Sequence, residues 1–187
     1  MDSIRERIQL DGVPLEEEPF WQAASLVREV ERRLLEEWGA FNYFEILTAM
    51  MFVVFQQETV DLAIIEVGIG GLLDNTNVGH PLVSVITTIG LDHQDLLGST
   101  LEEITAQKAG IIKPGQQVVV GPVTHECMDV IRGMASQQGA TVQAFGENFS
   151  LVDDSYQDEA FTIPLEHLAL QGAFQKENAT VAIRAFR

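Results

Sequence analysis

Residues 60–77 read VDLAIIEVGIGGLLDNTN, and residues 83–93 read VSVITTIGLDH. Each stretch begins with an apolar run of strand length and ends in glycine and polar residues, a pattern typical of a buried strand in a parallel sheet. In open α/β sheets, ligands bind in the crevice outside the carboxyl ends of such strands. We therefore expect Glu66, at the end of the first run, and His93, just beyond the second, to meet in one site.

Strand and helix patterns alternate along the rest of the chain. We predict strands at residues 60–67, 83–88, 117–120 and 141–145, and helices at residues 20–38, 44–55, 101–109, 126–138 and from 174 onward. This alternation predicts an α/β fold with a mainly parallel sheet flanked by helices. Residues 148–152 and 160–164 are expected to pair as a short antiparallel edge. The 187 residues suit one domain, which can bury roughly 70% of the surface that the unfolded chain exposes.

The chain is strongly acidic, because 28 Asp and Glu residues against 11 Lys and Arg residues give a formal net charge of −17. This charge repels phosphate backbones and anionic lipid surfaces, so we expect neither a nucleic acid nor a membrane partner. The N-terminal residues lack the apolar run of a secretory signal, and no stretch approaches the roughly 20 apolar residues of a membrane span. The single cysteine, Cys127, excludes an internal disulfide. Together these features favour a cytoplasmic protein.

Glu66 and His93 are the candidate metal ligands. A carboxylate at the end of an apolar run is costly to bury, so a divalent cation, an arginine or backbone N–H groups must compensate, and the residues leave these alternatives open. A lone histidine is usually a structural residue. If the two strands are neighbours, however, one carboxylate oxygen and one imidazole nitrogen form part of a shell for Mg²⁺ or Mn²⁺ that water and phosphate would complete.

The glycine-rich turn after the first run has two interpretations. Gly70 and Gly71 permit close approach of the backbone to a ligand, but a plain strand-exit turn also uses such glycines. Asp74, Thr76 and Asn77 can contact a polar substrate or simply form the turn. The turn does not match a dinucleotide fingerprint, and the chain contains no Gly-Lys dipeptide and hence no nucleotide phosphate loop.

Signals at both ends of a short helix place Lys108 in its last turn. Thr100 and Glu103 form a capping-box pattern at the start of this helix, and Gly110 stands where a left-handed C′ glycine is expected. A solvated lysine that is favoured by the helix dipole is the simplest interpretation of this position.

Eight short motifs occur in a fixed order along the chain. They are FE at 44–45, LTA at 47–49, VD at 60–61, EVGIGG at 66–71, LDNTN at 73–77, IGLDH at 89–93, LGSTL at 97–101 and KAGI at 108–111. The ordered set resembles the folylpolyglutamate synthase/dihydrofolate synthase family of the Mur ligase superfamily. The resemblance implies the fold of the central ATPase domain of Mur ligases.

Enzymes of this family use ATP to phosphorylate a carboxylate of a folate or of dihydropteroate, and the amine of L-glutamate then attacks the acyl phosphate. The resemblance implies that Glu66 and His93 bind Mg²⁺ and that Lys108 is carbamylated by CO₂ and helps to hold the metal site. A weaker match at residues 168–178 implies that Gln175 and Asn178 lie near the nucleotide. Three residues depart from the family pattern: Leu72 replaces an arginine, Gln107 a common glutamate and Phe174 a histidine.

The family pattern also leads us to expect a partial protein. A phosphate loop should precede the region of residues 4–8 and a C-terminal domain should follow Arg187, so residues 1–187 are expected to be a partial Mur-ligase-like central domain, truncated at both ends. By itself the chain is expected to bind ATP weakly and to lack ligase activity. Two alternatives are another Mur-type amino-acid ligase and a non-catalytic fold remnant that acts as an interaction module.

Overall fold

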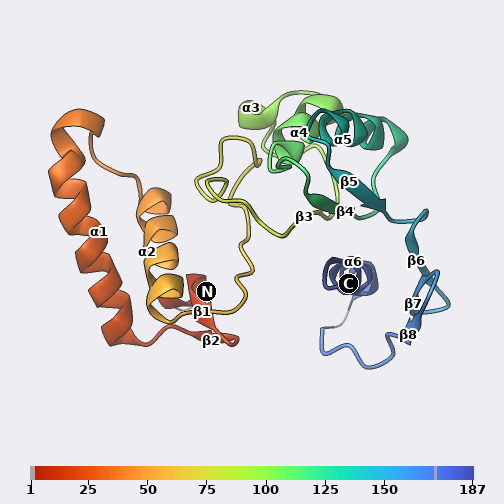
Figure 1. Ribbon diagram of the computed structural model, residues 1–187, viewed down its shortest axis with the longest axis horizontal. Helices are drawn as coiled ribbons and strands as arrows, with labels where there is room; N and C mark the ends of the chain where they lie inside the picture. The colour runs from red at the N-terminus through yellow and green to blue at the C-terminus, as the bar shows by residue number, and fades with distance from the viewer. Residues whose placement is uncertain (1–2, 171) are drawn as a thin grey trace. The chain divides into compact units, whose positions relative to one another are not determined.

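The structure is a computed structural model, and it describes residues 3–170 and 172–187 (Figure 1). Gln171, in the weakly matched segment 168–178, lies outside the described residues. Contacts within the chain divide it into two compact units, the residues up to Glu66 and those from Val67 to Arg187.

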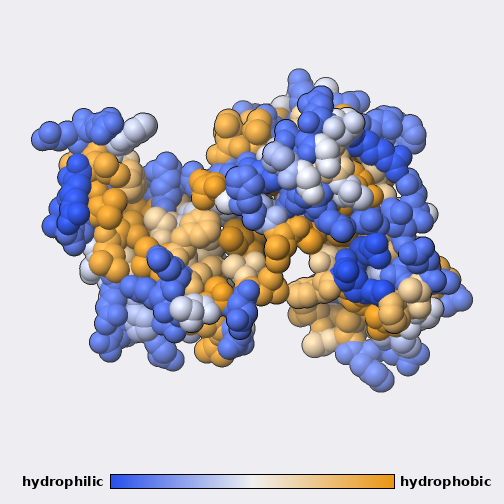
Figure 2. Space-filling view, viewed as in Figure 1, coloured by the Kyte–Doolittle hydropathy of each residue, from blue (hydrophilic) through white to orange (hydrophobic). Residues whose placement is uncertain are grey.

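Two helices form most of the first unit. α1 (Glu17–Trp38) and α2 (Tyr43–Gln57) lie side by side and pack against each other (Figure 1). Both predicted helices are therefore confirmed. Apolar side chains of α1 also reach the surface, as Figure 2 shows. The core between the helices and the residues before them contains Ile8, Leu15, Phe20, Ala23, Val27, Leu47, Met50 and Val54.

A short hairpin follows the 3₁₀ turn η1 (Ile4–Arg7) and precedes these helices. β1 (Gln9–Leu10) pairs antiparallel with β2 (Val13–Pro14). Between them Asp11 and Gly12 have φ angles of 52° and 77°, as a two-residue turn of the Asp-Gly type requires. The Asp-Gly dipeptide was a usable signal, but strands of two residues are too short to show an alternating pattern.

A three-stranded parallel sheet forms the centre of the second unit. β3 (Val83–Ile86), β4 (Gln117–Val120) and β5 (Thr141–Ala144) pair in the order β3-β4-β5. Parallel neighbours need crossover connections, which are usually helical. The sheet and its helices confirm the predicted α/β class.

Helices connect and cover these strands. α3 (Gln94–Leu97) and α4 (Leu101–Ala109) connect β3 to β4, and α5 (His125–Gln137) connects β4 to β5. α6 (Ala173–Ala185) contacts β3 and β4 and packs on the other face of the sheet (Figure 1).

Strand β4 shows that both faces of the sheet are covered. Val118 and Val120 belong to a core shared with α4 and α5, whereas Val119 between them packs with Val181 of α6. All three valines are almost completely buried. Burial on both faces explains why β4 is an unbroken apolar run.

A separate antiparallel sheet follows the parallel one. β6 (Phe149–Val152), β7 (Ser155–Asp158) and β8 (Thr162–Pro164) pair in that order. The predicted direct pairing of residues 148–152 with 160–164 is therefore wrong, because β7 lies between them. The sequence does not signal β7, since three of its four residues are polar, non-aromatic residues that are not typical of strands.

Asp158 anchors the end of α6 to this small sheet. Its carboxylate accepts hydrogen bonds from the Tyr156 hydroxyl at 2.6 Å and from two backbone N–H groups in the following turn. It also forms ion pairs with Arg184 and Arg187, and its side chain is only 1% exposed. The hydrogen bond from Tyr156 and the backbone hydrogen bonds lower the pKa of Asp158 to about 2.

Residues 60–67 do not form the predicted strand. No strand pairs with them within the described part of the chain, and the side chains of Leu62, Ile64 and Ile65 are exposed, that of Ile64 to 79%. A strand is stable only when a neighbour supplies hydrogen bonds to its backbone and other side chains cover it. The apolar composition predicts burial here, but no other strand among the described residues pairs with this segment.

Two further findings bear on the composition argument. Cys127 is a free thiol on the buried side of α5, where it behaves as a small apolar side chain. Of the helices in the described residues, none is long and apolar enough to cross a membrane.

Candidate functional site

The glycine-rich turn that follows Val67 is held together by Asp74. One carboxylate oxygen of Asp74 accepts hydrogen bonds from the backbone N–H groups of Gly68 and Ile69, both at 3.1 Å. The other oxygen accepts from the backbone N–H of Thr76 at 2.9 Å and from the Thr76 hydroxyl. Asp74 and Thr76 therefore act as turn residues, one of the two roles that the sequence allows.

A glycine is favoured at position 70 by its backbone conformation and at position 71 by close packing against another backbone. Gly70 has a φ angle of 73°, and a β-carbon there would lie 2.7 Å from Leu97 Cδ2. A β-carbon at Gly71 would lie 2.8 Å from the carbonyl oxygens of Gln107 and Lys108. The turn thus lies directly on the end of α4, the helix that carries Lys108, and both glycines are buried there.

Helix α4 begins as predicted and ends differently. The Thr100 hydroxyl accepts from the N–H of Glu103, and the Glu103 carboxylate accepts from the N–H groups of Ser99 and Thr100, which lowers the pKa of Glu103. Gly110 has a φ angle of −62°, so the predicted left-handed C′ glycine is wrong. A glycine is still needed there, because a β-carbon would lie 2.4 Å from Leu72 Cβ.

Lys108 lies in the last turn of α4 and is half-buried. Its amine forms no hydrogen bond or ion pair with any residue that the structure describes.

His93 is the N-cap residue of α3. Its φ and ψ angles of 50° and 39° are left-handed, a conformation that histidine adopts more often than most residues with a side chain. The side chain is 49% exposed, and Nε2 lies 3.7 Å from Asp92 Oδ2. The imidazole is therefore accessible, seven residues beyond the end of β3.

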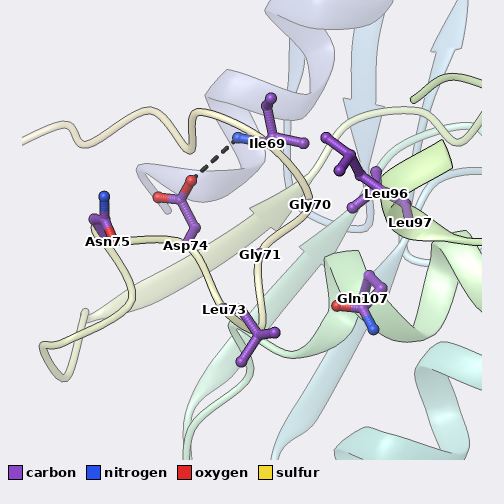
Figure 3. A pocket seen from close by; sticks show the side chains of 9 residues that line it. All are labelled: Ile69, Gly70, Gly71, Leu73, Asp74, Asn75, Leu96, Leu97 and Gln107. Atoms are coloured by element: carbon purple, nitrogen blue, oxygen red, sulfur yellow. Dashed lines mark hydrogen bonds between the residues drawn. The ribbon is translucent and has the colours of Figure 1, made fainter. Parts of the chain in front are cut away.

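One shallow pocket lies where these elements meet. Its volume is about 250 Å³, and it is lined by the glycine-rich turn, by Leu96 and Leu97 of α3 and by Gln107 of α4 (Figure 3). The Asp74 carboxylate lies beside it and bonds to the backbone of Ile69 (Figure 3). The pocket is thus lined by the predicted turn, by the helix that His93 caps and by the helix that carries Lys108. The side chains of His93 and Lys108 are not part of its lining.

Six of the nine residues that line this pocket were not among the predicted site residues: Ile69, Leu73 and Asn75 of the turn, Leu96, Leu97 and Gln107. Leu96 and Leu97 belong to α3, a helix of one turn that is too short to show periodicity. Gln107 had one usable signal, its place next to Lys108 on a helix whose start was predicted correctly.

Glu66 is the predicted site residue that the structure does not place with the others. It ends the first unit, whereas the pocket and His93 belong to the second. Its carboxylate is exposed and not buried as the sequence predicted, because residues 60–67 form no strand. The approach of Glu66 to His93 stays a prediction. Within residues 3–170 and 172–187, no three His, Cys, Asp or Glu side chains form a group that could hold a metal ion.

Gln175 and Asn178 lie one turn apart on α6. Asn178 Nδ2 donates to Gln175 Oε1 at 3.3 Å, so the two amides form one polar patch on the helix. The Asn178 side chain is exposed and the Gln175 side chain is half-buried. Their predicted contact with a nucleotide stays a prediction.

Comparisons with known proteins give the family. The chain is 37% identical to the folylpolyglutamate synthase of Lacticaseibacillus casei and 35% identical to the dihydrofolate synthase/folylpolyglutamate synthase of Bacillus subtilis (strain 168), over 97% and 98% of its length. It covers 45% of each relative, so it spans about half the length of the curated relatives that it matches. A solved FPGS–AMPPCP–folate complex matches 98% of this chain and 47% of that chain, with a TM-score of 0.92 and 36% identity. Residues 39–186 match the family model of the Mur ligase middle domain, and the chain therefore belongs to that family.

Proposed function

We propose that the chain is the middle-domain segment of an ATP-dependent ligase that joins L-glutamate to a folate or to dihydropteroate through an acyl phosphate. One observation carries the proposal: residues of three of the ordered motifs, at 66–71, 73–77 and 97–101, line one pocket of a fold that matches a complex of FPGS with an ATP analogue and folate. The matched residues 39–186 include parts of both compact units, which supports the assignment of residues 1–187 to one partial domain.

Lys108 is the proposed reactive residue of this segment. Its amine nitrogen would bond to the carbon of CO₂ and release one proton, which leaves an anionic N-carboxylate. The half-buried amine with no partner among the described residues supports this role, because a lysine held by a carboxylate would have to break an ion pair first. A carbamate turns a cation into an oxygen ligand of the kind that Mg²⁺ prefers.

The donor chemistry of the other proposed ligands fits Mg²⁺. Glu66 carries an exposed carboxylate without a hydrogen bond to the described residues, and His93 carries an accessible imidazole. When bound, Mg²⁺ supplies positive charge to phosphate oxygens. That charge is needed because the pocket has no basic residue in its lining and the chain has a net charge of −17.

The remaining predicted contacts divide into two groups. Gln175 and Asn178 form a polar patch that suits the hydrogen-bonding edge of a nucleotide base, and we propose that role for them. Asp74 already uses both carboxylate oxygens within the turn, so we propose that it shapes the pocket and does not bind the substrate directly.

A chimera tests this proposal. The 187 residues replace the matching segment of the Lacticaseibacillus casei enzyme, and ATP-dependent incorporation of radiolabelled glutamate into folate and into dihydropteroate is measured. We expect incorporation, and we expect Glu66→Gln and His93→Asn to lower turnover by about 100-fold or more with an unchanged melting temperature. Glu58→Gln, an exposed acid at the end of α2, is the matched control.

Two results would contradict the proposal. A folded chimera that joins amino acids only to other carboxylates would favour another Mur-type ligase. A folded chimera that joins glutamate to neither acceptor and binds no Mg-ATP would favour a non-catalytic segment.

A further inference from the structure

The end of α4 is capped by residues from outside the helix. A helix leaves its last four carbonyl groups without partners inside the helix, and a left-handed glycine often satisfies some of them. Gly110 is not left-handed. The N–H groups of Gly110 and Ile112 donate to the carbonyl oxygens of Gln107 and Ala109. In addition, the N–H of Leu72 donates to Gln107 O at 2.8 Å, and Asn77 Nδ2 donates to Gly110 O at 3.1 Å.

Asn77 joins two backbones through one amide group. Its NH₂ group has two donors, one for Gly110 O and one for Leu72 O, which lies 3.0 Å from Asn77 Nδ2. Both donors are therefore used inside the protein. The backbone carbonyl of Asn77 accepts from Lys113 Nζ at 3.2 Å, which adds a second connection between the turn and the chain after α4.

The two connected backbones have no free space between them. Gly71 lies against the carbonyl oxygens of Gln107 and Lys108, and Gly110 lies against Leu72, so a single added β-carbon on either glycine would collide. A displacement of the turn must therefore displace the last turn of α4. Lys108 has no side-chain partner among the described residues, so it is that backbone which fixes where its side chain begins and the region that its amine can reach.

We infer that Asn77 is a positioning residue for Lys108: its side-chain amide fixes the last turn of α4 against the glycine-rich turn and so sets where the Lys108 amine lies. The inference rests on the proposed function for the importance of that amine. The hydrogen bonds and contacts that carry it do not depend on the reaction.

The three lysines of the chain allow a direct test in the 187-residue protein itself. With ¹³C at lysine Cε, the protein gives separate NMR signals for Lys108, Lys113 and Lys176. Asn77→Asp keeps the shape of the side chain but removes both donors. Asn75→Asp adds the same charge in the same turn, at a side chain that makes no hydrogen bond within the described residues.

We expect Asn77→Asp to move the Lys108 signal well beyond any change caused by Asn75→Asp. The signal of Lys176, which is paired with Asp154, should stay in place in both variants. Equal Lys108 signals in the two variants would overturn the inference. If Asn77→Asp does not fold, Asn77→Ala is compared with Asn75→Ala on the same criterion.

A second measurement separates this inference from the proposed function. With ¹³C-bicarbonate, a carbamate signal is expected on Lys108 of the wild-type chain, reduced in Asn77→Asp and retained in Asn75→Asp. A wild-type chain without a carbamate would contradict the proposed role of Lys108, and the Cε signals would still decide whether Asn77 positions it. A carbamate of equal intensity in both variants would count against Asn77.

Discussion

Two segments, residues 60–67 and residues 83–86, are both apolar in sequence and were both predicted to be strands, but only residues 83–86 form one in the structure. β3 pairs along its whole length with β4, and its Ile86 is 4% exposed. Residues 60–67 pair with no strand in the part of the chain that the structure describes, and their Ile64 is 79% exposed. Both segments precede polar residues that the sequence assigns to one site.

The difference shows that an apolar run predicts burial but not secondary structure. Whether the run forms a strand depends on a neighbouring strand that can pair with it. β4 supplies that partner for β3 through a helical connection within the second unit. The consequence for function is direct, because His93 follows a formed strand, whereas Glu66 lies within a segment that pairs with no strand among the described residues.

The largest effect that we expect separates two matched isoleucines. Ile86→Ala should lower the free energy of unfolding by about 2 to 5 kcal/mol, because it removes buried methyl groups and leaves a cavity. Ile64→Ala should change it by less than about 0.5 kcal/mol, as at other exposed positions. Urea denaturation of both variants measures the difference. A similar loss in the free energy of unfolding for both variants would mean that residues 60–67 are buried, which would contradict the difference between the two segments.

A pair of glycines tests the turn that follows residues 60–67. Gly71→Ala should cost about 1 to 3 kcal/mol, because its β-carbon would meet the carbonyl oxygens at the end of α4. A β-carbon at Gly79 would have no atom within 4 Å, so Gly79→Ala should lower the free energy of unfolding by less than about 0.5 kcal/mol. The same denaturation experiment applies. A neutral Gly71→Ala would show that the turn does not lie on α4.

Substitutions at the helix caps test whether short sequence patterns alone determine where α2 and α4 begin. Asn42 caps α2, before residues 60–67, and Thr100 caps α4, after β3; both form capping boxes. Asn42→Ala and Thr100→Ala should each cost about 1 kcal/mol, since each leaves backbone N–H groups without an acceptor. Circular dichroism during thermal unfolding measures both. A cost at only one helix would argue that the surroundings, and not the local cap, decide these helix starts.

The smallest expected effect is a change in stability at acidic pH, and it depends on the hydrogen bonds and ion pairs of Asp158. The folded-state pKa of Asp158 is about 2, below the value of about 3.9 for an unfolded aspartate, so its contribution to stability is complete above that value and is lost as the pH falls towards about 2. Asp158→Asn should flatten the decline of stability between about pH 4 and pH 2. Asp154→Asn, which changes an exposed carboxylate, is the control. Identical acid profiles for the wild type and Asp158→Asn would refute the assignment.

The sequence by itself determined the features that depend on a few neighbouring residues. The capping box at Thr100 and Glu103 predicted where α4 begins and hence that Lys108 lies on it, and the apolar residues at 117–120 predicted the strand β4 within its observed bounds. These signals succeed because a cap is satisfied by backbone groups three residues away and a periodic pattern is a property of one element.

Only the tertiary structure decided which partner each segment finds. Residues 60–67 pair with no strand that the structure describes, and β7 lies between the two predicted antiparallel strands. Gly110 is needed for contact with Leu72 and not for a left-handed turn. Likewise, the amide of Asn77 caps a helix that begins 24 residues further along the chain. The physical reason is that hydrogen bonds and packing between distant segments depend on both partners, and a local pattern describes only one of them.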